Sequence, residues 1–168
     1  MKKLTKIAAI SFFALFLSAC DQKSETNATA NSRVSTLEQG IADYKALSDW
    51  NQAQGQKLAD AQLALQQKVL AQDSSQIQQA LAVFESTTAS LLNELSNLKL
   101  QNPEVIAVRT KINEALSLHK DLVISYVTKP SLSDEEKAAI QKKEQQSQQV
   151  NQELQVLQAK LQEKFGAK

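Results

Sequence analysis

Apolar residues recur at alternating steps of three and four along most of the chain after residue 33, which is the spacing of one buried helix face. Three short stretches interrupt this pattern, at residues 73–75, 102–104 and 129–133. Each contains a residue that suits the N-cap position before a new apolar run, namely Asp73, Asn102 and Ser133. The pattern therefore predicts four helices, over residues 34–72, 75–100, 103–128 and 134–165.

The second and third predicted helices keep regular, coiled-coil-like seams. Their seam residues are Ile77, Leu81, Phe84, Thr88, Leu91, Leu95 and Leu98 in one, and Val105, Val108, Ile112, Ala115, His119, Leu122 and Tyr126 in the other. Thr88 and His119 stand out as polar members of these seams. Because short connections favour antiparallel neighbours, we predict an all-α, elongated, antiparallel up-down four-helix bundle with coiled-coil-like packing. The alternative is an extended coiled coil that a second copy completes.

The first predicted helix is less regular. Its apolar stripe consists of Val34, Leu37, Ile41 and Tyr44, then Leu47 and Trp50, and later Leu58, Ala61, Leu65 and Val69. Residues 51–56 between these groups contain almost no large apolar side chain, and Gly55 costs about 1 kcal/mol relative to alanine inside a helix. We therefore expect a phase shift, a bend or a break between Trp50 and Gln56.

The first twenty residues follow a different pattern. Lys2, Lys3 and Lys6 precede an apolar run over residues 7–17, which is too short to span a bilayer because spanning takes about 20 apolar residues. Small residues follow, and this order is typical of an export signal. The sequence Leu17-Ser18-Ala19-Cys20 resembles the lipobox of bacterial lipoproteins. The resemblance implies cleavage between Ala19 and Cys20, diacylglycerol on the Cys20 thiol and acylation of the new amine.

These patterns divide the chain into a signal peptide (1–19), a lipidated cysteine with a polar tether (20–32) and a helical bundle domain (33–168). The tether lacks apolar periodicity, so its composition predicts disorder. Asp21 resembles the residue that retains enteric lipoproteins in the inner membrane. That resemblance implies the periplasmic face of the inner membrane, and the outer membrane remains the alternative.

Composition excludes several function classes. The chain has 19 basic and 18 acidic residues, and the mature chain without Lys2, Lys3 and Lys6 has 16 basic residues, so no basic excess exists to bind nucleic acid. The low counts of 3 glycines and 2 prolines argue against a β-sandwich. Cys20 is the only cysteine, so the chain forms no internal disulfide.

No residue pattern indicates catalysis or metal binding. His119 is the only histidine, and Glu114 lies five residues before it, off the spacings that share a helix face. A catalytic nucleophile needs an adjacent base and a third orienting group, and the sequence provides no such set. We predict that the protein is not an enzyme, has no cofactor or metal, and keeps His119 partly buried in the bundle.

The favoured functional hypothesis is a non-enzymatic envelope lipoprotein that binds another envelope protein through its helical faces. The polar first half of the last helix, with Lys143 and Ser147 at seam positions, could splay or receive a partner helix. One alternative is a bundle that binds a small ligand near Gly55, Thr88 and His119. The other is a spacer that forms homo-oligomers. Trp50 would mark a contact surface if the first helix bends there, and would fill a gap in the core if it does not.

Overall fold

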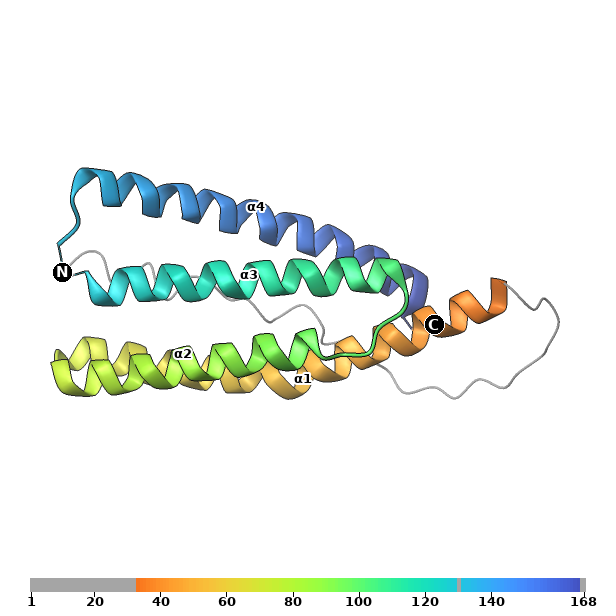
Figure 1. The fold of residues 1–168 in the computed structure, drawn as a ribbon, viewed down its shortest axis with the longest axis horizontal. Coiled ribbons are helices and arrows are strands. Elements are labelled where there is room, and N and C mark those ends of the chain that lie inside the picture. The colour runs from red at the N-terminus through yellow and green to blue at the C-terminus, as the bar shows by residue number, and fades with distance from the viewer. Residues whose placement is uncertain (1–32, 130, 167–168) are drawn as a thin grey trace.

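The computed structural model describes residues 33–129 and 131–166, and within them it contains four helices and no strand. The helices are α1 (Arg33–Ala71), α2 (Ser74–Ser96), α3 (Pro103–Thr128) and α4 (Asp134–Phe165). Consecutive helices run antiparallel in an elongated assembly (Figure 1). The structure therefore confirms the predicted all-α, up-down four-helix bundle.

Local capping explains where three of the helices begin. The Asp73 side chain accepts a hydrogen bond from the backbone N–H of Gln76 at 3.1 Å, and Asn102 Oδ1 accepts from the N–H groups of Glu104 and Val105 at 3.0 and 3.2 Å. Ser133 caps α4. Because these side chains satisfy backbone donors that have no partner within the helix, the capping signals predicted the helix starts to within one residue.

Helix α2 ends earlier than its apolar seam predicted. The predicted end was Leu100, whereas α2 ends at Ser96 with Asn97 as its C-cap. The chain leaves the helix because Asp43 of α1 binds the following segment. Its Oδ2 accepts hydrogen bonds from the backbone N–H groups of Gln101 and Asn102, both at 2.6 Å. Tertiary contact, not local sequence, sets this end of α2.

Helix α1 is continuous from Arg33 to Ala71, so of the three expected alternatives near Gly55 the break does not occur. The phase shift does occur. The core positions pass from Trp50 through the half-buried Gln54 to Leu58, and this pair of four-residue steps replaces the usual alternation of three and four. Such an insertion rotates the buried stripe around an unbroken helix.

The predicted buried stripe at the start of α1 is wrong at two positions, although Tyr44 packs against the core as expected. Leu37 and Ile41 are 46% and 45% exposed, while Gly40 and Asp43 are buried. The Phe165 ring of α4 packs on Gly40, where an added Cβ would lie 2.3 Å from a ring carbon. The chain therefore turns its glycine, not its leucine and isoleucine, toward α4, because only glycine permits this approach.

The two ends of the bundle differ. We call the end with the α2–α3 connection (residues 97–102) the link end, and the end with the α1–α2 and α3–α4 connections (residues 72–73 and 129–133) the turn end. The core runs through both and includes Phe84, Leu91, Leu95, Val105 and Val108. Helix α4 meets α1 at the link end and diverges from it toward the turn end (Figure 1).

Candidate functional site

His119 lies in the core and is 1% exposed. Its Nε2 is 3.1 Å from Oε1 of Gln62 on α1, and its ring meets the Phe84 ring of α2 edge-on at 6.0 Å. Burial lowers the pKa of His119 from 6.5 to about 4, because desolvation disfavours the charged imidazolium. The imidazole is therefore neutral at pH 7 and joins α1, α2 and α3.

Thr88 is fully buried beside the same phenylalanine. Its Oγ1 donates a hydrogen bond to the backbone carbonyl of Phe84 at 2.8 Å. Both polar seam residues singled out from the sequence therefore contact Phe84, Thr88 at its backbone carbonyl and His119 at its ring. Their contacts favour a packing role, while ligand binding near Gly55 stays a prediction.

Trp50 is 7% exposed and belongs to the core. The surface-contact interpretation required an exposed Trp50, whereas the structure places its side chain among the core residues. Trp50 therefore has the other role that the sequence allowed, as an aromatic residue that fills the core where the stripe shifts phase.

Asp43 is a buried polar residue that the sequence analysis missed. It is 3% exposed, and its Oδ1 accepts a hydrogen bond from Nε2 of Gln39 at 2.6 Å, in addition to the two bonds that Oδ2 accepts from the α2–α3 connection. The available signal was its position between Gly40 and Leu47 at steps of three and four. An acidic residue at that spacing indicates a buried polar contact.

Polar contacts hold the first half of α4 on α3. The Tyr126 hydroxyl donates a hydrogen bond to Glu144, and Lys143 pairs with Asp121 at 3.0 Å. Burial, together with the neighbouring Glu144 carboxylate, raises the pKa of Tyr126 to about 12, so the phenol stays protonated. Ser147 takes the next buried position on α4. The sequence predicted weak packing for the first half of α4, and small and polar side chains do lie at its interface with α3.

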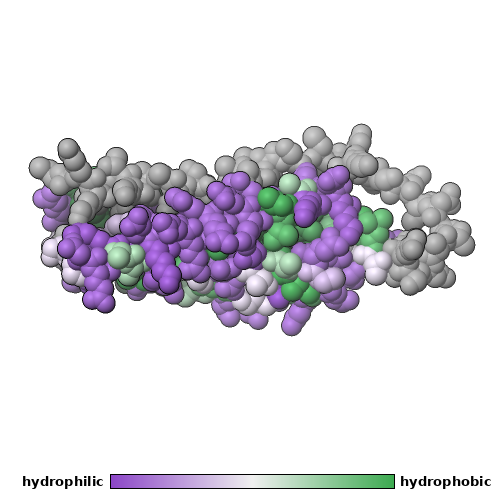
Figure 2. Space-filling view, turned by 90° about the horizontal axis from the view of Figure 1, so that it is seen from above, coloured by the Kyte–Doolittle hydropathy of each residue, from purple (hydrophilic) through white to green (hydrophobic). Residues whose placement is uncertain are grey.

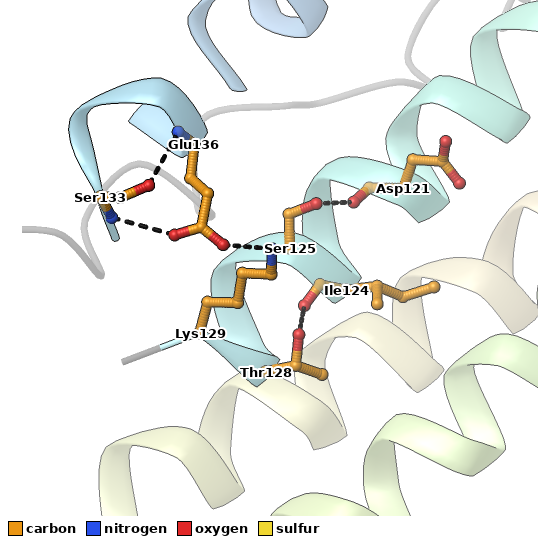
Figure 3. Close-up of polar contacts among 7 residues, drawn as sticks. All are labelled: Asp121, Ile124, Ser125, Thr128, Lys129, Ser133 and Glu136. Atoms are coloured by element: carbon orange, nitrogen blue, oxygen red, sulfur yellow. Dashed lines mark hydrogen bonds and ion pairs between the residues drawn. The ribbon is translucent and has the colours of Figure 1, made fainter. Parts of the chain in front are cut away.

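The α3–α4 connection is fixed by a capping box (Figure 3). Ser133 and Glu136 exchange hydrogen bonds between side chain and backbone at 2.9 and 3.2 Å, and Lys129 donates to Glu136 at 2.6 Å. The Lys129 ammonium and the Ser133 hydrogen bonds lower the pKa of Glu136 to about 2. This cluster stabilises the start of α4 and anchors it to the end of α3.

Comparison with known proteins adds a family to this geometry. A family model described as uncharacterised lipoprotein PM1805 matches residues 41–166, which is nearly all of the helical body. The chain belongs to this lipoprotein family. No curated protein and no solved structure matches the chain.

Membership implies that the PM1805-family lipoprotein is anchored to a membrane through lipid. The predicted cleavage site at Ala19, the lipidated Cys20 and the sorting residue Asp21 lie outside the described residues and before the matched region. These three assignments therefore remain predictions from the sequence. Among the described helices of the lipoprotein, none is both long enough and apolar enough to cross a membrane.

The described residues of the lipoprotein contain no group of three or more histidine, cysteine, aspartate or glutamate side chains that could hold a metal ion. They do contain exposed apolar side chains that the sequence analysis did not single out. Leu63 and Leu70 of α1 are 53% and 64% exposed near the turn end, and their spacing of seven residues places them on one helix face.

The side of the lipoprotein that α4 covers is mostly hydrophilic toward the turn end, and its apolar residues gather toward the link end (Figure 2). Val156 of α4 is one of the exposed apolar residues. The exposed apolar residues are thus distributed over both ends of the bundle.

Proposed function

We propose that this lipoprotein is a non-enzymatic adaptor that is anchored by acylated Cys20 and binds a helix of another envelope protein at the turn end of α1. The observation that carries the proposal is the exposed pair Leu63 and Leu70. Two large leucines on one helix face, each more than half exposed, offer the anchor positions that an amphipathic partner helix uses.

The arrangement of α4 supports this choice of surface. The contacts that join α1 to α4 lie at the link end, where Tyr44 donates a hydrogen bond to Gln162 at 2.6 Å and Phe165 packs on Gly40. Toward the turn end α4 diverges from α1 (Figure 1). Leu63 and Leu70 therefore lie on a part of α1 that α4 does not cover.

The spacing of Leu63 and Leu70 determines which apolar positions a partner helix needs. A rise of 1.5 Å per residue separates Leu63 from Leu70 by about 10 Å along α1, so a partner helix would place apolar side chains about two turns apart. Burying each exposed leucine surface would contribute on the order of 1 kcal/mol. Polar contacts around the pair would supply specificity, as at the rim of other protein interfaces.

The length of the bundle supports an adaptor role. Helix α3 contains 26 residues, which corresponds to about 40 Å between the link end and the turn end. Since α1 begins at the link end (Figure 1), an anchor at Cys20 would keep the link end nearest to the bilayer and leave the turn end free to reach a partner. The buried, neutral His119 also supports a non-enzymatic role, because it is unsuited to act as an exposed general base at pH 7.

Site-specific photocrosslinking in intact cells tests the proposal. A photoreactive residue at position 63 or 70 should give a saturable adduct with one envelope protein, and the same residue at Val83 of α2, which is 57% exposed, should not. Leu63→Asp should abolish the adduct formed from position 70 without changing the melting temperature. Equal adducts from positions 63, 70 and 83, or none from any of them, would contradict the proposal.

We also propose the periplasmic face of the inner membrane as the location, and Asp21 supports this choice. Cys20→Ser should leave the bundle folded and release it from membranes. Asp21→Ser should keep the anchor and move the protein into the outer-membrane fraction on density gradients. If the Asp21→Ser protein and the natural chain are found in the same fraction, the inner-membrane assignment is wrong.

A further inference from the structure

The link end carries a second exposed apolar pair, Leu37 and Ile41, four residues apart on α1. The buried side of α1 at this level consists of Gly40 and Asp43, which face α4 and the α2–α3 connection. Successive helical residues are about 100° apart around the axis, so Ile41 points well away from the side that carries Gly40. Leu37 and Ile41 each keep nearly half of their surface exposed, so the contact between α1 and α4 does not enclose them.

The position of the pair relative to the anchor indicates what covers it. The first turns of α1 project past the ends of the other helices (Figure 1). Residues 21–32 alone separate Cys20 from the first residue of α1. Even a fully extended chain spans at most about 3.6 Å per residue, so this end of α1 stays within about 50 Å of the lipidated residue, and within about 20 Å on average if the segment is a flexible coil.

We infer that Leu37 and Ile41 dock on the lipid surface itself and set the tilt of the bundle on the membrane. This inference rests on the proposed anchoring at Cys20. Each buried CH₂ group contributes about 0.8 kcal/mol, so two half-exposed aliphatic side chains would bind a bilayer only weakly from solution. A tether makes the same contact intramolecular, and the high effective concentration of lipid makes a weak contact sufficient.

The charges at this end indicate an apolar, salt-insensitive contact. Lys45 pairs with Asp49 at 2.6 Å, and Lys164 pairs with Glu104. Both lysines are thus paired with a carboxylate, so these two side chains do not form the free basic cluster that anionic lipid headgroups attract. The contact is therefore expected on zwitterionic as well as anionic bilayers. Because Leu37 and Ile41 lie on the side of α1, their insertion would tilt the bundle instead of holding it upright.

Depth measurements with nitroxide labels test the inference on the full, acylated lipoprotein in phosphatidylcholine vesicles. Acylation blocks the Cys20 thiol, so Leu37→Cys or Ile41→Cys would provide a single reactive site. The matched controls are Leu63→Cys at the turn end and Val156→Cys on α4, both exposed to a similar degree. Labels at 37 and 41 should collide several-fold more with oxygen and several-fold less with a water-soluble nickel chelate than labels at 63 and 156, at both low and high salt.

Equal nickel accessibility at positions 37 and 63 would overturn the inference. Protection at 37 together with spin–spin broadening that grows with protein density would assign the surface to a second copy, and would also overturn it. Labelling of the natural chain at Cys20 would show that the anchor itself is absent, which would overturn the proposed function as well. Failure of the crosslinks at Leu63 and Leu70 would leave the result at positions 37 and 41 unaffected, so the two proposals can fail separately.

Discussion

The link end and the turn end are built from the same four helices but are closed by different side chains. At the link end, Phe165 packs on Gly40 and Asp43 binds the backbone of the α2–α3 connection. At the turn end, α4 is held on α3 by the Tyr126–Glu144 and Lys143–Asp121 contacts. The comparison teaches that close helix approach requires a small residue opposite a large one, and that polar interface residues leave α4 free to diverge.

Removal of the buried carboxylate should have the largest effect on the link end. Asp43→Ala would leave two backbone N–H groups without their acceptor, and we expect a loss of about 2–4 kcal/mol in the free energy of unfolding. Urea denaturation measures this loss. Asp49→Ala, which removes an exposed ion pair, is the control and should cost less than about 1 kcal/mol.

Asp43→Asn keeps an acceptor oxygen and should recover part of the stability that Asp43→Ala loses. If Asp43→Ala and Asp49→Ala were equally stable, the hydrogen bonds at the α2–α3 connection would not contribute to closure of the link end.

Acid should destabilise the part of the core that joins the two ends. The pKa of His119 is about 4 in the folded protein and about 6.5 in the unfolded chain, so the unfolded state binds more protons between these values. Stability should therefore be complete above pH 6.5 and should fall by about 2 kcal/mol by pH 5. Glu136, with a folded pKa of about 2, loses its contribution only below about pH 4.5.

Urea denaturation at pH 7, 6 and 5 measures this dependence. The matched variant His119→Asn removes the titrating group and should show a nearly flat profile over the same range. A profile of the natural chain that stays flat from pH 7 to pH 5 would contradict the assignment of a neutral, buried imidazole.

Two glycines in α1 provide a matched test of close approach. Gly40→Ala should displace the Phe165 ring and cost about 1–2 kcal/mol, because an overpacked contact outweighs the gain in helix propensity. Gly55→Ala lies in the same helix and should stabilise it by up to about 1 kcal/mol. Melting temperatures of the two variants should therefore shift in opposite directions.

The Phe165→Ala background separates the causes. Without the ring, Gly40→Ala should become neutral or stabilising. If it remains equally destabilising, the ring contact does not explain why glycine is needed at position 40.

Mutations at the turn end should change the free energy of unfolding less than mutations at the link end. They should instead increase the rate of local opening. Tyr126→Phe and Lys143→Ala remove partly exposed polar contacts, and each should cost less than about 1 kcal/mol. Hydrogen exchange in residues 134–147 should nevertheless accelerate, while residues 158–165 at the link end should keep their protection. Uniform acceleration along α4 would show that the two halves of α4 open together.

The sequence predicted those parts of the fold that interactions between neighbouring residues determine. Asn102 with Pro103 and Ser133 with Glu136 contain their own capping partners within four residues, so the starts of α3 and α4 could be read directly. The burial of His119 followed from its seam position. These features depend on residues that are near one another in the sequence.

The rest depends on contacts between distant segments. Helix α2 ends before its predicted end because Asp43 binds the backbone of Gln101 and Asn102. These two residues lie 58 and 59 positions after Asp43 in the sequence. Leu37 and Ile41 are exposed, whereas the Phe165 ring packs on Gly40 of the same helix. Trp50 is buried, and helix α1 remains continuous where its apolar stripe shifts phase. No local pattern contains the information about which residue of α4 meets which residue of α1.

The separation of Tyr44 from Gln162 by 118 residues has a consequence for how the protein folds. Contacts between consecutive helices have short loops to close, so the two hairpins should form rapidly, whereas the contact between α1 and α4 requires most of the helical body. The hairpin of α1 and α2 comes first in the chain, and closure of the link end requires Gln162 and Phe165 of α4. We therefore expect refolding to show fast hairpin formation followed by a slower phase in which Phe165 reaches Gly40.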